Sequence, residues 1–223
     1  MIERGLWPAD IDARHNLTAF TERVIRLDPA AVIRLRSRPD DTFVAWAATG
    51  FEVLAARVVP GRVTPPDLCA GADTLVRGLS GVPVAVSGAP DTAKIDPGFA
   101  MDSAWRGVLP PETGFAHVDD VPAEVLTDVV RRGTDLAREH GGPHGPPPSL
   151  LDQQVLTVTG TDANEVGLPM RCIFAMTAMG FVPDPLPPGE VVRVRATPSW
   201  LRIDARYGSV YRSRGGPMLV VSP

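Results

Sequence analysis

Lysine, asparagine and long apolar runs are nearly absent from this sequence of 223 residues. Of its 22 basic residues only Lys94 is a lysine, and asparagine occurs only as Asn16 and Asn164. Because this bias runs through the whole chain, it indicates a GC-rich genome, with selection of arginine for bidentate anion binding as the alternative. No apolar run reaches roughly 18 residues, so the sequence predicts no membrane-spanning helix.

Cysteine and histidine are also scarce. Cys69 and Cys172 lie far apart, without Cys-x-x-Cys spacing or neighbouring histidines, and each falls within an apolar helical pattern. We therefore predict two small buried hydrophobic side chains and no metal site. The four histidines are expected on the surface, and they are His15, His117, His140 and His144.

The familiar catalytic and cofactor motifs are missing as well. The chain has no Gly-x-Ser-x-Gly, no Gly-x-x-x-x-Gly-Lys-Ser/Thr and no Gly-x-Gly-x-x-Gly, which argues against the enzymes that depend on them. A turn and a helix cap explain the acidic pairs Asp40-Asp41 and Asp119-Asp120. We expect no catalytic residues, no cofactor and no enzymatic activity.

What the chain does contain is the composition of an ordinary globular protein, 44% hydrophobic and 22% charged. A net charge of −4 argues against a surface built throughout to neutralise phosphates, although it leaves a local basic patch open. Residues 1–12 carry charges and Pro8 where a signal peptide needs an apolar core. A cytoplasmic location is therefore expected.

The N-terminal half predicts a helix, an antiparallel meander and a second helix. Leu17, Phe20 and Val24 recur at helical spacing, and short turns separate three alternating strands. The predicted helices are 10–27 and 66–79, and the predicted strands are 31–36, 42–48 and 51–59. Residues 81–120, rich in proline, are predicted to be a long irregular region, and such regions tend to be functional or flexible.

The C-terminal half repeats this sequence of helix and meander. The predicted helices are 122–140 and 168–180, the predicted strands are 191–196, 200–205, 209–214 and 219–221, and 150–158 is ambiguous. The fold class is therefore α+β, with two antiparallel meanders each covered by helices and a pseudo-duplication left open. A stiff Gly/Pro tether at 143–148 predicts a division into residues 1–142 and 149–223, which could also share one core.

Trp105 gives the first functional hypothesis. It stands in the segment Trp105-Arg106-Gly107-Val108-Leu109, and Trp and Arg are enriched at the energetic centres of protein interfaces. With no catalytic constellation in the chain, we predict a non-enzymatic interaction or regulatory protein. Its partner-binding residues would be Trp105, Arg106 and Leu109, its partner an unidentified protein, and its oligomeric state is not predictable.

An arginine-rich C-terminal β section gives the second hypothesis. Residues 191–214 contain six arginines, and the acidic residues set against them are Glu190 and Asp204. A helix followed by a basic hairpin is typical of the end of a winged-helix unit, so nucleic-acid binding is the alternative function. Its residues would be Arg171, Arg193, Arg195, Arg202 and Arg206. The competing interpretation is a solvated sheet face in an arginine-rich protein.

A third hypothesis is a carrier of a small apolar ligand. Met176, Met179 and Phe181 follow one another at or after the helix predicted over 168–180. They could line a pocket between helix and sheet, and the competing interpretation is an ordinary hydrophobic core.

Four stretches of sequence carry a resemblance to a known group. They are Trp105-Arg106-Gly107 with Leu109-Pro110-Pro111; Leu150-Leu151-Asp152 with Val155-Leu156-Thr157-Val158; Pro169-Met170-Arg171 with Met179-Gly180-Phe181; and Trp200 with Tyr207-Gly208-Ser209-Val210-Tyr211. In these the chain resembles uncharacterised conserved proteins of actinobacteria, mainly over its C-terminal half. The resemblance implies an actinobacterial source, and it assigns no activity to this chain.

Overall fold

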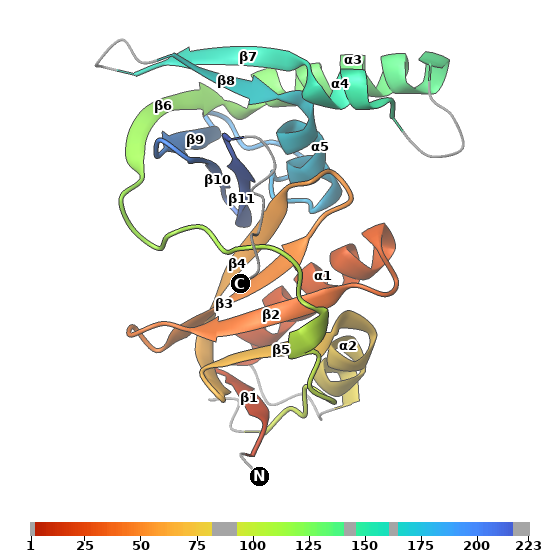
Figure 1. The fold of residues 1–223 in the computed structure, drawn as a ribbon, viewed down its shortest axis with the longest axis vertical. Coiled ribbons are helices and arrows are strands. Elements are labelled where there is room, and N and C mark those ends of the chain that lie inside the picture. Colours follow the sequence, from red (N-terminus) through yellow and green to blue (C-terminus); the bar gives the residue numbers. More distant parts are fainter. Residues whose placement is uncertain (1–2, 82–92, 141–145, 161–164, 216–223) are drawn as a thin grey trace, which may run out of the picture. The chain divides into compact units, whose positions relative to one another are not determined.

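A computed structural model describes residues 3–81, 93–140, 146–160 and 165–215 (Figure 1). The chain forms two units, the first of Met1–Gly50 with Leu54–Val108 and the second of Phe51–Val53 with Leu109–Pro223. The division after Val108 falls earlier than the tether at 143–148, of which residues 141–145 lie outside the described ranges. No helix within those ranges is both long enough and apolar enough to span a membrane.

The first unit begins with the short strand β1 (Gly5–Pro8) and the predicted helix α1 (Ile11–Leu27). Asp10 starts the helix because its carboxylate accepts a hydrogen bond from the backbone N–H of Ala13 at 2.7 Å, which satisfies a donor that the helix cannot. Leu17, Phe20 and Val24 are buried, so the helical spacing seen in the sequence is the core-facing side of α1.

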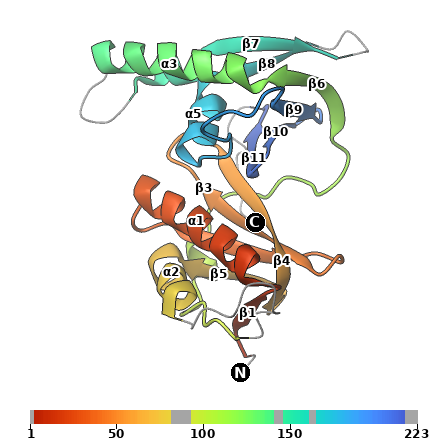
Figure 2. The same ribbon diagram turned by 180° about the vertical axis from the view of Figure 1, so that it is seen from behind.

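The predicted meander is confirmed in β2 (Val32–Ser37), β3 (Thr42–Ala48) and β4 (Leu54–Thr64), which pair antiparallel. β5 (Asp67–Gly71) adds beside β2, and β1 pairs with β4. Helix α2 (Ala72–Gly81) packs against α1, and both cover one face of the sheet (Figure 2). Side chains at alternate strand positions, such as Ile33, Leu35 and Phe43, are fully buried there.

The helix predicted over 66–79 is wrong in its first part. Residues 67–71 form β5, whose Cys69 stands opposite Arg34 of β2, and the helix begins only at Ala72. Leu68 and Ala70 are buried, so pairing with β2 and burial on the core face outweigh the helix-start signal of Pro65-Pro66-Asp67.

The second unit contains a four-stranded antiparallel sheet in the order β6, β9, β10, β11. These strands are Ala116–Pro122, Val191–Ala196, Trp200–Ala205 and Gly208–Ser213. Helices α3 (Ala123–His140) and α5 (Met170–Ala178) pack together. The short helix α4 (Pro148–Asp152) precedes a two-stranded ribbon of β7 (Gln154–Thr159) and β8 (Glu165–Pro169) (Figure 1). Strand β7 of this ribbon also contacts β6.

Four predictions in this half need comment. The meander over 191–214 is confirmed, with Val192 and Val194 buried beneath the outward Arg193. Residues 116–120 of the region predicted as irregular form most of β6, and the helix predicted from 168 begins at Met170 because Glu165–Pro169 forms β8. The strand predicted at 219–221 lies outside the described residues.

The two units repeat one arrangement of elements. In the first, α1 leads into β2–β3–β4, and the strand–helix pair β5–α2 adds beside β2. In the second, α5 leads into β9–β10–β11, and the strand–helix pair β6–α3 adds beside β9. The pairs differ in chain order, since β5–α2 follows its meander and β6–α3 precedes its own. The α+β class and the repeated helix-and-meander pattern therefore agree with the sequence analysis.

Candidate interaction surfaces

Trp105 is anchored on the first unit by a cation–π contact. The guanidinium of Arg34 lies 5.8 Å from the centroid of the indole ring. Arg34 is itself held by Asp67, with Nε and Nη2 donating to the two carboxylate oxygens at 2.8 and 2.7 Å. The indole Nε1 donates to the carbonyl of Gly107 at 3.1 Å. The half-buried ring is therefore held in place by contacts within the first unit.

The chain preceding Trp105 is bound to the outer edge of β5. The backbone N–H of Cys69 donates to the carboxylate of Asp102, and the carbonyl of Cys69 accepts from the N–H of Met101, both at 3.1 Å. Arg4 adds hydrogen bonds to the carbonyls of Cys69 (2.8 Å) and Gly98 (3.3 Å). These contacts cover the edge strand, which would otherwise offer unpaired backbone groups to another chain. The described part of the segment predicted as irregular is thus held in place.

Several side chains of this segment project into solvent. Phe99 is 90% exposed and Val108 is 50% exposed, which is unusual for large apolar side chains on one short stretch. Arg106 is exposed, and within the described residues it has no ion pair. We call Phe99, Trp105, Arg106 and Val108 the segment surface.

The predicted partner-binding trio is thus divided between the two units. Trp105 and Arg106 belong to the first unit, whereas Leu109, half-buried, begins the second. The sequence analysis missed Phe99, for which the available signal was a large aromatic side chain inside a non-periodic, proline-containing stretch.

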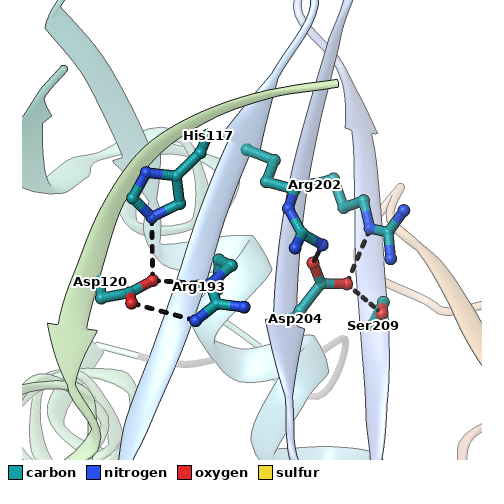
Figure 3. A network of polar contacts seen from close by, with 7 residues as sticks. His117, Asp120, Arg193, Arg202, Asp204 and Ser209 are labelled. Carbon is teal, nitrogen blue, oxygen red and sulfur yellow. Dashed lines mark hydrogen bonds and ion pairs between the residues drawn. The ribbon is translucent and has the colours of Figure 1, made fainter. Parts of the chain in front are cut away.

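The predicted nucleic-acid residues of β9 are bound to carboxylates on the exposed sheet face (Figure 3). Arg193 donates to both oxygens of Asp120 on β6, at 2.9 and 3.2 Å, and His117 Nε2 lies 3.0 Å from the same carboxylate. The hydrogen bonds from Arg193, and then from His117, lower the pKa of Asp120 to about 2. Arg195 pairs with Asp204 of β10.

Asp204 also binds the predicted arginine of β10. Arg202 Nε donates to it at 2.7 Å, and the Ser209 hydroxyl donates to the same carboxylate (Figure 3). The Arg202 guanidinium lies 5.4 Å from the Tyr211 ring centroid and 5.8 Å from that of Phe115. The Asp204 carboxylate therefore balances the charge of Arg202, and the rings of Tyr211 and Phe115 make cation–π contacts with its guanidinium.

Arg206 and Arg171 have carboxylate partners too. Arg206 donates to Glu190, which lowers the pKa of that carboxyl and raises the pKa of the arginine. Arg171 is 5% exposed at the start of α5, and it donates to Glu52 at 2.6 Å, to Asp152 at 2.5 Å and to the carbonyl of Phe51 at 3.0 Å. A buried guanidinium cannot reach a base edge, so Arg171 does not join the sheet arginines in one surface.

Groups that nucleophilic catalysis would need are not brought together on this face. His117 is on β6 and Ser209 on β11, three strand spacings apart, or about 14 Å, and each is bonded to its own aspartate (Figure 3). Burial raises the pKa of the Cys69 thiol to about 11 and that of the Cys172 thiol to about 12, so neither is an activated nucleophile. Across the described ranges, no group of three His, Cys, Asp or Glu side chains could hold a metal ion.

The side chains considered for an apolar ligand are part of the core of the second unit. Met176, Met179 and Phe181 are almost completely buried. A Cβ added to Gly208 would lie only 2.5 Å from the Phe181 ring, so the strand backbone packs directly on that ring.

Comparison with known proteins divides the chain at the same place as its fold. Residues 1–107 match a family model described as "Domain of unknown function (DUF8010)", and residues 110–217 match one described as "Domain of unknown function (DUF8185)". The boundary between the two models coincides with the division of the units after Val108. No curated protein sequence matches the chain.

Solved structures of DNA polymerase sliding clamps share its fold. Among them are the clamp from Bacillus subtilis (TM-score 0.57, 14% identity), the polymerase beta subunit of Streptococcus pyogenes (0.58, 13%) and a structure assigned to the DNA polymerase III beta subunit of Eubacterium rectale (0.61, 12%). Each match covers 96% of this chain but only 65–66% of the clamp chain, a little under two thirds. Each half of this chain is thus similar to a family of unknown function, and the whole has the fold of a sliding clamp over part of the clamp's length.

Proposed function

We propose that this protein is a non-enzymatic interaction scaffold that binds a protein partner through the segment surface. The observation that carries the proposal is the pairing of an anchored Trp105 with exposed neighbours on one short stretch of chain. Phe99 and Val108 offer apolar area, and Arg106 offers a charge that no described residue neutralises.

The anchoring of Trp105 favours protein binding for an energetic reason. Side chains that are ordered before binding lose less conformational entropy when the complex forms. Arg34, the Gly107 carbonyl and the bonds along the β5 edge already hold the tryptophan and its backbone. Trp and Arg are also the side chains most enriched among residues that dominate binding energy.

The likeness to sliding clamps supports a scaffold rather than a catalyst, and it makes DNA a second candidate partner. Two features of this chain weigh against DNA. The five predicted arginines are already paired with carboxylates, so a phosphate would have to displace an existing partner. On the longer helices α1, α2, α3 and α5, the charges of the described solvent-facing side chains nearly cancel, so these helices offer no basic surface for phosphates. The acids are Asp12, Glu22, Asp73, Glu124, Asp128 and Asp135, and the bases are Arg23, Arg26, Arg77, Arg131 and Arg132.

Site-specific photo-crosslinking tests the proposal. A benzophenone amino acid replaces Val108 in one variant and Val191, an exposed residue of the second unit, in the control. The proposal expects one discrete crosslinked protein from the Val108 variant, which Trp105→Ala abolishes without changing the melting temperature, and no such product from the Val191 variant. Equal products from both positions, or a product that survives Trp105→Ala, would overturn the proposal.

A further inference from the structure

A groove of about 390 Å³ lies within the second unit, between the end of the β7–β8 ribbon and one end of the main sheet. Glu165 and Val166 of β8 line it from the ribbon. His117 and Val118 of β6, Pro198 of the β9–β10 turn and Arg214 after β11 line it from the sheet. Its volume falls in the range of sites that accept small organic ligands.

A β-bulge shapes one wall of this groove. The register between β6 and β9 shifts between His117 and Asp119, so Val118 is an extra residue without a partner on β9. Bulges redirect side chains out of the regular alternation and occur often beside functional sites. Here Val118 joins Val166 and Pro198 as an apolar part of the lining.

Arg214 differs from the other arginines of the C-terminal β section. The other five, at positions 193, 195, 202, 206 and 212, each pair with a carboxylate. Arg214 donates from Nη1 to the carbonyl of Thr197 at 3.0 Å and has no carboxylate partner among the described residues. That carbonyl orients the guanidinium but leaves its charge uncompensated.

Glu165, from the ribbon, supplies the opposite charge. Its carboxylate is exposed and likewise has no ion pair within the described ranges. Among the described residues, the groove therefore carries one uncompensated cation on the sheet side, one uncompensated anion on the ribbon side and an apolar part of the lining.

We propose that this groove binds a small zwitterion, a free amino acid or dipeptide with an aliphatic side chain. The ligand carboxylate accepts hydrogen bonds from Arg214, its ammonium group pairs with Glu165, and its aliphatic side chain contacts Val118, Val166 and Pro198. The groove shares no residue with the segment surface. A negative result for one proposal therefore does not contradict the other.

Titration of the ¹⁵N-labelled protein with L-leucyl-L-leucine, followed by amide chemical shifts, tests the assignment. The assignment expects saturable shifts confined to the groove lining, at residues 114–118, 160, 165–166, 196–197 and 214. N-acetyl-leucyl-leucine lacks the ammonium group and leucyl-leucinamide lacks the carboxylate, so each should bind about tenfold or more weakly. The substitutions Arg214→Gln and Glu165→Gln should each weaken the binding of L-leucyl-L-leucine by a similar factor of about ten or more.

Arg132→Gln is the matched control, since Arg132 is an exposed arginine of α3 in the same unit and does not line the groove. Its dipeptide affinity should equal that of the unmodified protein. Absence of saturable shifts at millimolar dipeptide, binding of either blocked compound as tight as that of L-leucyl-L-leucine, or equal effects of Arg132→Gln and Arg214→Gln would each overturn the assignment.

Discussion

Arg171 illustrates how a charged side chain can serve the core at the scale of a single residue. Its side chain is only 5% exposed, while its two carboxylate partners remain largely exposed to water. The Nε atom is buried without a hydrogen-bond partner among the described residues, which adds a cost that the three other bonds must outweigh.

We expect Arg171→Ala to destabilise the protein by about 2–3 kcal/mol, because it removes a packed side chain and leaves a void. The loss is not larger because Glu52 and Asp152 can be solvated once the arginine is gone. Urea unfolding measures the change. The control Arg132→Ala, on an exposed helix face, should stay within about 0.5 kcal/mol of the unmodified protein. Equal stabilities of the two variants would contradict a structural role for Arg171.

Asp120 makes a pH-dependent contribution to stability. Its pKa falls from the ordinary 3.8 to about 2 in the folded protein, so the folded state favours the ionised carboxylate. The resulting stability is fully present above about pH 4 and is lost as the pH falls towards 2. Asp120→Asn should therefore lower the urea midpoint at pH 6, with the difference shrinking between pH 4 and 2.

Salt provides a check on this interpretation. Because the Arg193–Asp120 pair is partly exposed, the difference at pH 6 should be small and should decrease further in about 1 M salt. A difference that persists unchanged down to pH 2 would show that the asparagine acts through packing rather than charge.

The sequence could identify Arg171 as unusual but could not place it. Its position at the start of a helix followed by a basic hairpin suggested an exposed side chain. Its partners Glu52 and Asp152 are 119 and 19 residues away, and no local pattern links such positions. The partner of Arg193 was hidden for the same reason, since Asp120 lies 73 residues before it. The partners of the other sheet arginines, Asp204 and Glu190, are near in sequence, but the pairing itself depends on the strand register. The sequence could therefore identify the candidate arginines, but it could not show that carboxylates neutralise their charges.

At the scale of elements, helices and alternating strands were predictable, whereas edge strands were not. The helix α1 and the strands β9 and β10 bury alternate or regularly spaced apolar residues, and that periodicity is visible in the sequence. β6 has the sequence Ala-His-Val-Asp-Asp-Val-Pro, with little β propensity. Its pairing with β9 and the Arg193–Asp120 contact fix it, and both are tertiary features.

Gly208, at the start of β11, tests how tightly strand and core are packed. A Cβ there would lie 2.5 Å from the fully buried ring of Phe181, whose backbone carbonyl also accepts a hydrogen bond from Tyr207 N at 3.1 Å. We expect Gly208→Ala to cost about 1–3 kcal/mol through overpacking. Thermal unfolding measures this. Gly215→Ala, where the added Cβ meets open space, should have little effect, and similar losses for both would contradict the packing argument.

At the scale of the whole molecule, the sequence showed that helix and meander occur twice, and the structure has that arrangement in both units. The sequence did not show that the order of the strand–helix pair changes between the units, because β5 and β6 carry no strand pattern. The boundary was also hidden, since the most conspicuous Gly/Pro stretch is not where the units divide.

Nucleic-acid binding can be tested with the intact protein. With its sheet arginines paired, the protein should give no retardation of duplex DNA in a gel at about 50 mM salt. Salt-sensitive retardation that weakens when Arg193, Arg195 and Arg202 become alanine would instead support the nucleic-acid alternative. Retardation unaffected by those changes would point to another basic surface.

The most direct test of the scaffold proposal is the affinity of the crosslinked partner, once purified, for variants of this protein. Trp105→Ala should weaken binding by about 2 kcal/mol or more, roughly thirtyfold, because it removes an anchored aromatic side chain from the centre of the contact. Val191→Ala, on the second unit, should bind as the unmodified protein does. A folded Trp105→Ala variant with unchanged affinity would contradict the account.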